Sequence, residues 1–110
     1  MGVIETLTGA IGRRKPVKFE YNKPGKIKGI RVGNPHAVFV FTAKASNVQS
    51  TKAHIVQVDG VSDTDADNEF RMFDVGDMSS VECLEDADCF ELHEKYNPDW
   101  DGYSDVIAKV

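Results

Sequence analysis

Electric charge is divided unevenly along this chain, and the division limits how the chain can fold. Residues 1–52 carry ten Lys and Arg against two Asp and Glu, a net charge of +8. Residues 53–110 carry three Lys and Arg against sixteen Asp and Glu, a net charge of −13. The overall charge of −5 therefore conceals two opposite fields. Such an asymmetry indicates either that the halves fold onto each other or that the basic half binds an anionic partner.

The chain is expected to form one domain, residues 1–110, because this length is sufficient to bury a core and fold alone. Apolar residues recur at helical spacing from Val3 to Ile11, which predicts an N-terminal helix over residues 1–12. Gly12 follows the last apolar position and is a plausible stop for that helix. Residues 16–86 are expected to follow as a β-rich unit, with residues 90–110 as a C-terminal tail.

Short apolar runs separated by turn residues predict a β-rich fold after the helix. Strands are expected at residues 17–21, 27–32, 37–42, 55–58, 70–73 and 81–84. The segment Gly33-Asn34-Pro35 is expected to separate the second strand from the third. Many short strands favour a small barrel over a parallel sheet. The tail carries seven large apolar side chains, so we expect it to dock on this unit, with a short helix over residues 103–109.

Several classes of function lack their signals here. The chain contains no Ser/His/Asp order, Walker loop, HExxH or GxGxxG, so we expect no enzyme and no cofactor. Cys83 and Cys89 do not have the spacing of a zinc site, which predicts reduced thiols in a cytoplasmic protein. Residues 63–69 resemble the start of a calcium-binding EF-hand loop, but their flanks are strand-like, so a solvated hairpin loop is expected instead. We expect no metal, no signal peptide and no membrane association.

The order of segments resembles the WYL domain of bacterial and phage regulators. Four short pieces carry the resemblance: Arg13-Arg14-Lys15-Pro16-Val17-Lys18-Phe19-Glu20-Tyr21, Asn34-Pro35-His36-Ala37-Val38, Phe70-Arg71-Met72-Phe73 and Met78-Ser79-Ser80-Val81. The resemblance covers roughly residues 8–86. It implies a divergent, stand-alone member of that family with a small Sm/SH3-like β-barrel, which would sense a nucleotide or nucleic acid on a basic face.

The same resemblance implies a ligand pocket formed by His36, His54 and Arg71. The chain departs from the family pattern in two segments. The triplet that names the family falls on Ala53-His54-Ile55, and two further arginines of the last segment fall on Asp74 and Asp77.

Basic residues gather at the end of the predicted helix and in the adjoining strand. These are Arg13, Arg14, Lys15 and Lys18. Arginine and lysine at such a site suit phosphate oxygens, so these four are the candidate nucleic-acid contacts. The alternative is a solvated surface in which the basic groups favour the helix C-terminus. Similarly, His36 and His54 would either hold an anion beside Arg71 or be satisfied by backbone carbonyl groups.

The sequence therefore predicts a non-enzymatic binding or regulatory module that recognises a nucleotide or single-stranded nucleic acid. A second interpretation is an acidic protein-interaction module, acting as a nucleic-acid mimic or inhibitor, whose carboxylates bind a basic protein. A homo-oligomer formed through edge strands is a further possibility that the pattern leaves open.

Overall fold

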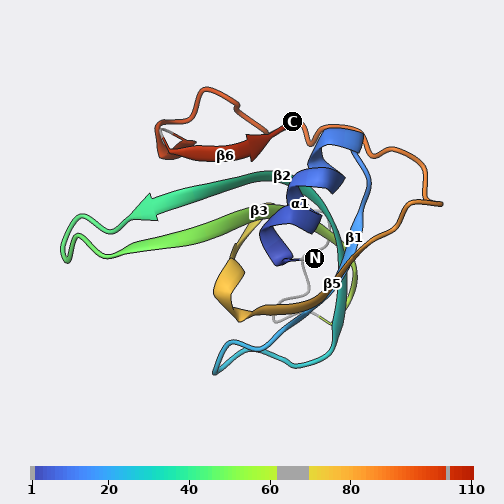
Figure 1. Cartoon of the computed structure of the whole chain (residues 1–110), viewed down its shortest axis with the longest axis horizontal. Helices are drawn as coiled ribbons and strands as arrows, with labels where there is room; N and C mark the ends of the chain where they lie inside the picture. Colours follow the sequence, from blue (N-terminus) through green and yellow to red (C-terminus); the bar gives the residue numbers. More distant parts are fainter. Residues whose placement is uncertain (1, 62–69, 104) are drawn as a thin grey trace.

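The computed structural model describes residues 2–61, 70–103 and 105–110, which form one helix, six strands and two 3-10 turns. The helix is α1 (Val3–Arg13), and the strands are β1 (Val17–Tyr21), β2 (Ile30–Thr42), β3 (Gln49–Gly60), β4 (Phe70–Asp74), β5 (Met78–Cys83) and β6 (Val106–Lys109). The turns are η1 (Val75–Asp77) and η2 (Asp101–Tyr103). The expectation of a mainly β fold with an N-terminal helix is confirmed (Figure 1).

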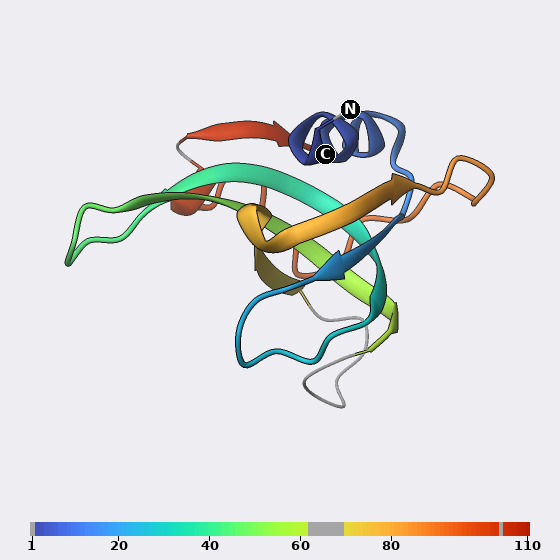
Figure 2. The same cartoon turned by 60° about the horizontal axis from the view of Figure 1, so that its bottom comes forward.

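All six strands belong to one antiparallel sheet with the order β4-β3-β2-β1-β5, and β6 is paired to β2. The edge of β2 that faces away from β3 takes two partners in turn. It pairs with β1 along residues 30–33 and with β6 along residues 37–39. Beyond these partners β2 and β3 continue as a hairpin that projects from the body of the molecule (Figures 1 and 2).

β2 runs without interruption through Gly33 and Pro35, where a break was predicted, so the expected strands at residues 27–32 and 37–42 form one element. A Cβ on residue 33 would lie 2.4 Å from Ile55 Cγ2 and 2.9 Å from the Val56 carbonyl oxygen, so glycine permits the close approach of β3. The pairing register of β2 with β3 shifts after Pro35. This irregularity accommodates proline, which has no N–H to donate between the two strands. These residues reshape the strand without ending it.

α1 packs one apolar stripe against the sheet, with Leu7, Ala10 and Ile11 buried. The helix ends one residue later than predicted, because Arg14 adopts the left-handed conformation (φ 53°) and its N–H donates to Ile11 O. The stop is thus made by an arginine, not by Gly12. In the described part of the chain, no helix has the length and apolar character that crossing a bilayer requires.

The C-terminal tail packs on the sheet as expected, but its last residues are wrongly predicted as a helix. Residues 106–109 form β6, and the preceding residues 101–103 form η2. Val40 N–H donates to Asp105 O, and Val110 N–H donates to His36 O, so hydrogen bonds to β2 bracket the short strand. The open edge of β2 and the β-branched residues of the tail favour strand pairing over an isolated helical turn.

Two apolar clusters lie on opposite faces of β2, because neighbouring strand residues point to opposite sides. The larger cluster packs between the sheet and α1 and includes Phe19, Val38 and Phe73. The smaller one consists of Ala37, Phe39 and Tyr103, with Phe41 and Tyr96 packed against it. This second cluster lies under the tail and positions the site described next.

Candidate ligand pocket

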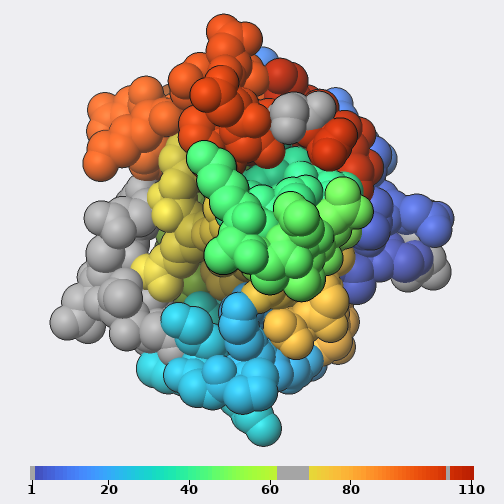
Figure 3. All heavy atoms as spheres, turned by 90° about the vertical axis from the view of Figure 1, so that its left-hand side faces the viewer, coloured from blue at the N-terminus to red at the C-terminus, as the bar shows by residue number. Residues whose placement is uncertain are grey.

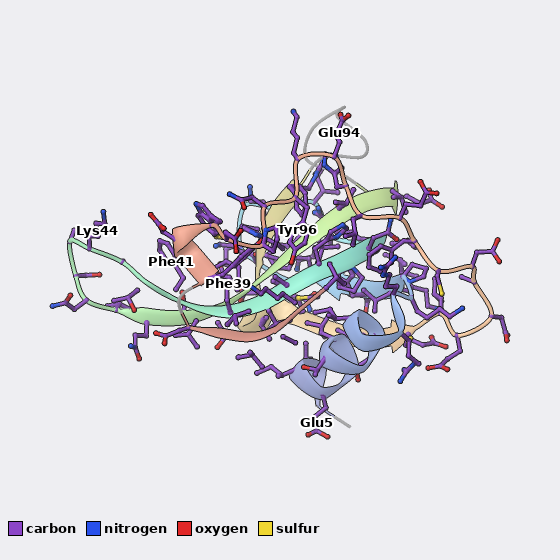
Figure 4. All side chains as sticks on the ribbon, turned by 90° about the horizontal axis from the view of Figure 1, so that it is seen from above. Glu5, Phe39, Phe41, Lys44, Glu94 and Tyr96 are labelled. Carbon is purple, nitrogen blue, oxygen red and sulfur yellow. The ribbon has the colours of Figure 1, made fainter. Side chains whose placement is uncertain are left out.

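The tail and one face of β3 and β4 surround a cavity of about 260 Å³. Its lining residues are His54, Phe70, Lys95, Tyr96, Asn97, Trp100 and Tyr103. Two of these residues come from the sheet and five from the tail, so the pocket depends on tail docking. Tyr96 of the tail packs against the cluster that contains Phe39 of β2, and Figure 4 labels both side chains.

Strand register brings the two sheet residues of the pocket together. His54 lies opposite Met72 and Val56 opposite Phe70 in the β3–β4 ladder. Paired residues share a face of the sheet, as do residues two apart on one strand, so His54 and Phe70 point to the same side. Their ring centroids are 6.0 Å apart.

Trp100 covers His54 from the tail side. The two rings are stacked with centroids 5.3 Å apart and an interplanar angle of 29°. The indole folds back over Gly102, where a Cβ would lie 2.2 Å from the ring, so a residue with a side chain would displace it. Tyr103 N–H donates to Trp100 O (2.9 Å), and this turn sets the Trp100 and Tyr103 rings edge to face.

One hydrogen bond joins sheet and tail inside the pocket. His54 Nδ1 and the Tyr103 hydroxyl lie 2.7 Å apart. Burial lowers the pKa of His54 from 6.5 to about 4, with a smaller contribution from His36. Burial also raises the pKa of Tyr103 to about 12, and Tyr96 adds to this shift. Both groups are therefore neutral at pH 7, and the pocket offers hydrogen-bonding groups on an aromatic surface.

His36 packs close to this pocket but does not line it. It is fully buried, and its ring contacts Phe70, with centroids 4.9 Å apart. Its Nδ1 lies 2.8 Å from Asn34 O, and its Nε2 accepts a hydrogen bond from His93 N–H at 3.1 Å. Burial lowers its pKa, so the neutral ring with a proton on Nδ1 satisfies both contacts. His36 thus ties the tail to the sheet through backbone groups.

Arg71 lies on the other side of β4 from this pocket. It pairs with Ile55 and alternates with Phe70 along the strand, which places it on the face that carries Phe73. The structure therefore brings His36 and His54 to one surface and sets Arg71 on the opposite one. The three residues named as one pocket by the family resemblance do not converge.

The basic residues at the end of α1 face the acidic half of the chain. Three of them have partners in residues 82–87: Arg13 with Glu85 (2.6 Å), Lys18 with Glu82 (3.2 Å) and Lys15 with the carbonyl oxygen of Ala87 (2.5 Å). Arg14 is exposed and has no ion pair among the described residues. The two halves of opposite charge do pack onto each other at this surface.

Asp74 makes the most buried of these contacts. Its carboxylate binds the ammonium groups of both Lys23 and Lys52, and the Asp74 and Lys52 side chains are each 18% exposed. These two lysines hold the pKa of Asp74 below its usual value. Asp74 N–H also donates to the Tyr21 hydroxyl at 2.9 Å. A carboxylate thus stands where the resemblance implied an arginine, and it joins β4 to β3 and to the segment after β1.

The acidic segment of residues 63–69 falls outside the described residues. Among the residues that are described, no group of three His, Cys, Asp or Glu is arranged to hold a metal ion. Cys83 and Cys89 are both free.

Sequence reasoning did not identify the tail residues of the pocket. Lys95, Asn97, Trp100 and Tyr103 were not singled out as ligand contacts, because their role depends on the path of the tail across the sheet. The density of large apolar side chains in the tail was the available signal, and it indicated docking without indicating a cavity.

Compared with known proteins, the chain matches no protein-family model and no curated sequence.

Proposed function

We propose that the protein is a non-enzymatic binding module for a nucleotide, whose base lies in the pocket of His54, Phe70 and Trp100. The observation that carries the proposal is an aromatic cavity with a few polar groups at its wall, which is the usual design of a small-molecule site. The low pKa of His54 supports a binding role, because a catalytic acid or base works best with a pKa near the working pH.

The size and chemistry of the pocket favour one planar, polar ring. Its volume of about 260 Å³ is slightly below the roughly 300 Å³ at which drug-sized sites begin. Aromatic rings stack on bases at a gain of about 1–3 kcal/mol each. The Asn97 amide and the His54 imidazole provide both donors and acceptors for a base edge. Lys95 is exposed at the wall of the pocket and would pair with a phosphate.

This assignment moves the main ligand contacts away from the end of α1. Arg13, Lys15 and Lys18 already bind carboxylate or carbonyl oxygens, and a phosphate there would have to displace them. Single-stranded nucleic acid is the second candidate source of the base, with Arg14 as a basic residue for its phosphates.

We further propose that the sheet closes into a small Sm/SH3-like barrel of the WYL type. The helix before β1 and the strand order support this proposal. The edge strands β4 and β5 are joined by the three residues of η1 alone. In addition, Asn22 N–H donates to Asp77 O, which holds η1 against the end of β1.

Trp100 is the only tryptophan, so its fluorescence reports directly on the proposed site. We expect AMP to change this fluorescence, with adenosine binding about tenfold more weakly because it lacks the charge that pairs with Lys95. Lys95→Ala should reduce the affinity for AMP to that for adenosine and leave adenosine binding unchanged. Arg14→Glu is the matched control and should leave both affinities unchanged.

Two outcomes would overturn the pocket assignment. If Arg14→Glu abolishes AMP binding while Lys95→Ala has no effect, the ligand binds at the end of α1. If neither AMP nor adenosine changes the fluorescence at millimolar concentration, the aromatic cavity is not a nucleotide site.

A further inference from the structure

A second cavity, of about 360 Å³, lies between the projecting hairpin and the tail. It is lined by Val40, Phe41, Thr42, Lys44, Trp100, Asp101, Gly102 and Asp105. Among the described residues, Trp100 alone lines both this cavity and the nucleotide pocket. Figure 3 looks onto the tip of the hairpin, drawn in green, with the orange and red tail above it.

This cavity adjoins an open strand edge. β6 covers β2 only as far as Phe39, and the last bond across this edge runs from Val40 N–H to Asp105 O. Because backbone groups alternate along a strand, the N–H and C=O of Thr42 point to the same edge as Val40 N–H. Within the described part of the chain, those two groups of Thr42 have no hydrogen-bond partner. An unpaired edge of this kind is a template for another strand.

The lining of the cavity favours a cation. Asp101 and Asp105 are exposed, and neither forms an ion pair among the described residues. The Trp100 indole is 39% exposed, and the faces of such rings attract ammonium and guanidinium groups. Among the described residues of the lining, Lys44 is the one cation, and Figure 4 shows it at the far end of the hairpin.

We propose that this edge binds an extended peptide that carries a lysine or arginine. The peptide backbone adds to β2 at Thr42, and the basic side chain enters the cavity between the two carboxylates and Trp100. Main-chain hydrogen bonds provide affinity in this mode of recognition, and the pocket provides specificity. The acidic half of the chain thereby gains a docking surface for a basic partner, next to the nucleotide pocket with which it shares Trp100.

The test uses the full chain and a fluorescently labelled peptide of about eight residues that alternates threonine with lysine, a length typical of a strand. We expect anisotropy to show saturable binding at low salt. The double variant Asp101→Asn/Asp105→Asn should weaken it at least about tenfold. The matched control is Asp86→Asn/Asp88→Asn, which removes two exposed carboxylates from a different loop and should leave binding unchanged.

A backbone variant separates strand addition from charge attraction. Thr42→Pro removes the N–H at the open edge, where proline is tolerated, so it should abolish peptide binding while leaving the thermal midpoint close to that of the parent. If the two double asparagine variants lose the same peptide affinity, overall charge explains the loss and the proposal is wrong. Undiminished binding by Thr42→Pro, equal binding of a peptide with glutamate in place of lysine, or no binding of the lysine peptide at low salt would also overturn it.

Discussion

Replacing Asp74 by asparagine is expected to lower the free energy of unfolding by about 2 kcal/mol. Removing one partner of a buried ion pair costs about 3–5 kcal/mol, while exposed pairs contribute at most about 1 kcal/mol. The pair of Asp74 and Lys52 lies between these limits, with both side chains 18% exposed. The variant leaves the Lys52 ammonium without its carboxylate in a half-buried site. Urea unfolding measures the loss as a lower midpoint at unchanged slope.

Glu82→Gln is the matched control for this prediction. It removes the carboxylate of another cross-half pair, with Lys18, but the side chains are 63% and 42% exposed. Its effect should stay within about 0.5 kcal/mol, as for other surface substitutions. Equal effects of the two variants would mean that overall charge balance, not the buried contact at Asp74, stabilises the packing of the two halves.

The uneven charge of the sequence therefore predicted a feature of the fold. It offered two interpretations, and ion pairs such as Lys23–Asp74 and Arg13–Glu85 agree with packing of one half onto the other. The sequence could not show which carboxylate would be buried. That depends on β3 and β4 being neighbours, which places Lys52 opposite Asp74.

Local sequence patterns correctly predicted a helix or strand where the neighbouring elements favour the same conformation as the local residues. The helical spacing at the start gave α1, and the alternation after Pro16 gave β1. The same reasoning failed where neighbours override local signals. β2 continues through Gly33 because β3 requires a residue without a side chain there. The end of the tail becomes β6 because β2 offers it an edge.

The candidate site was predictable only in part for the same reason. Pairing of the strands places His54 opposite Ala37, so the two histidines were reasonable neighbours to expect. Their separate environments follow from the register shift between Pro35 and Ala37 and from the docked tail. No spacing in the sequence shows that Trp100 returns to stack on His54.

Acidification from pH 7 to pH 4 is expected to lower the free energy of unfolding by about 3 kcal/mol through His54. The folded protein keeps this ring neutral because burial lowers its pKa from 6.5 to about 4. The unfolded chain takes up the proton below pH 6.5, so the unfolded state gains stability from there downward. Each pKa unit corresponds to about 1.4 kcal/mol. The contribution of the neutral His54 ring to the free energy of unfolding is complete above pH 6.5 and is lost as the pH falls towards 4.

Trp100 fluorescence and urea unfolding across this range check the prediction. The indole stacks on His54, so its emission should titrate with a midpoint near the lowered pKa of about 4. His36 acts in the same direction, since a proton on its Nε2 would oppose the His93 N–H that binds there. His54→Phe keeps an aromatic ring but cannot titrate, so it should remove the part of the acid sensitivity that His54 contributes and leave the parts of His36 and Asp74. A midpoint near 6.5 in the parent protein would contradict the buried contact, because it would mean that solvent reaches His54 and that the tail does not close the pocket.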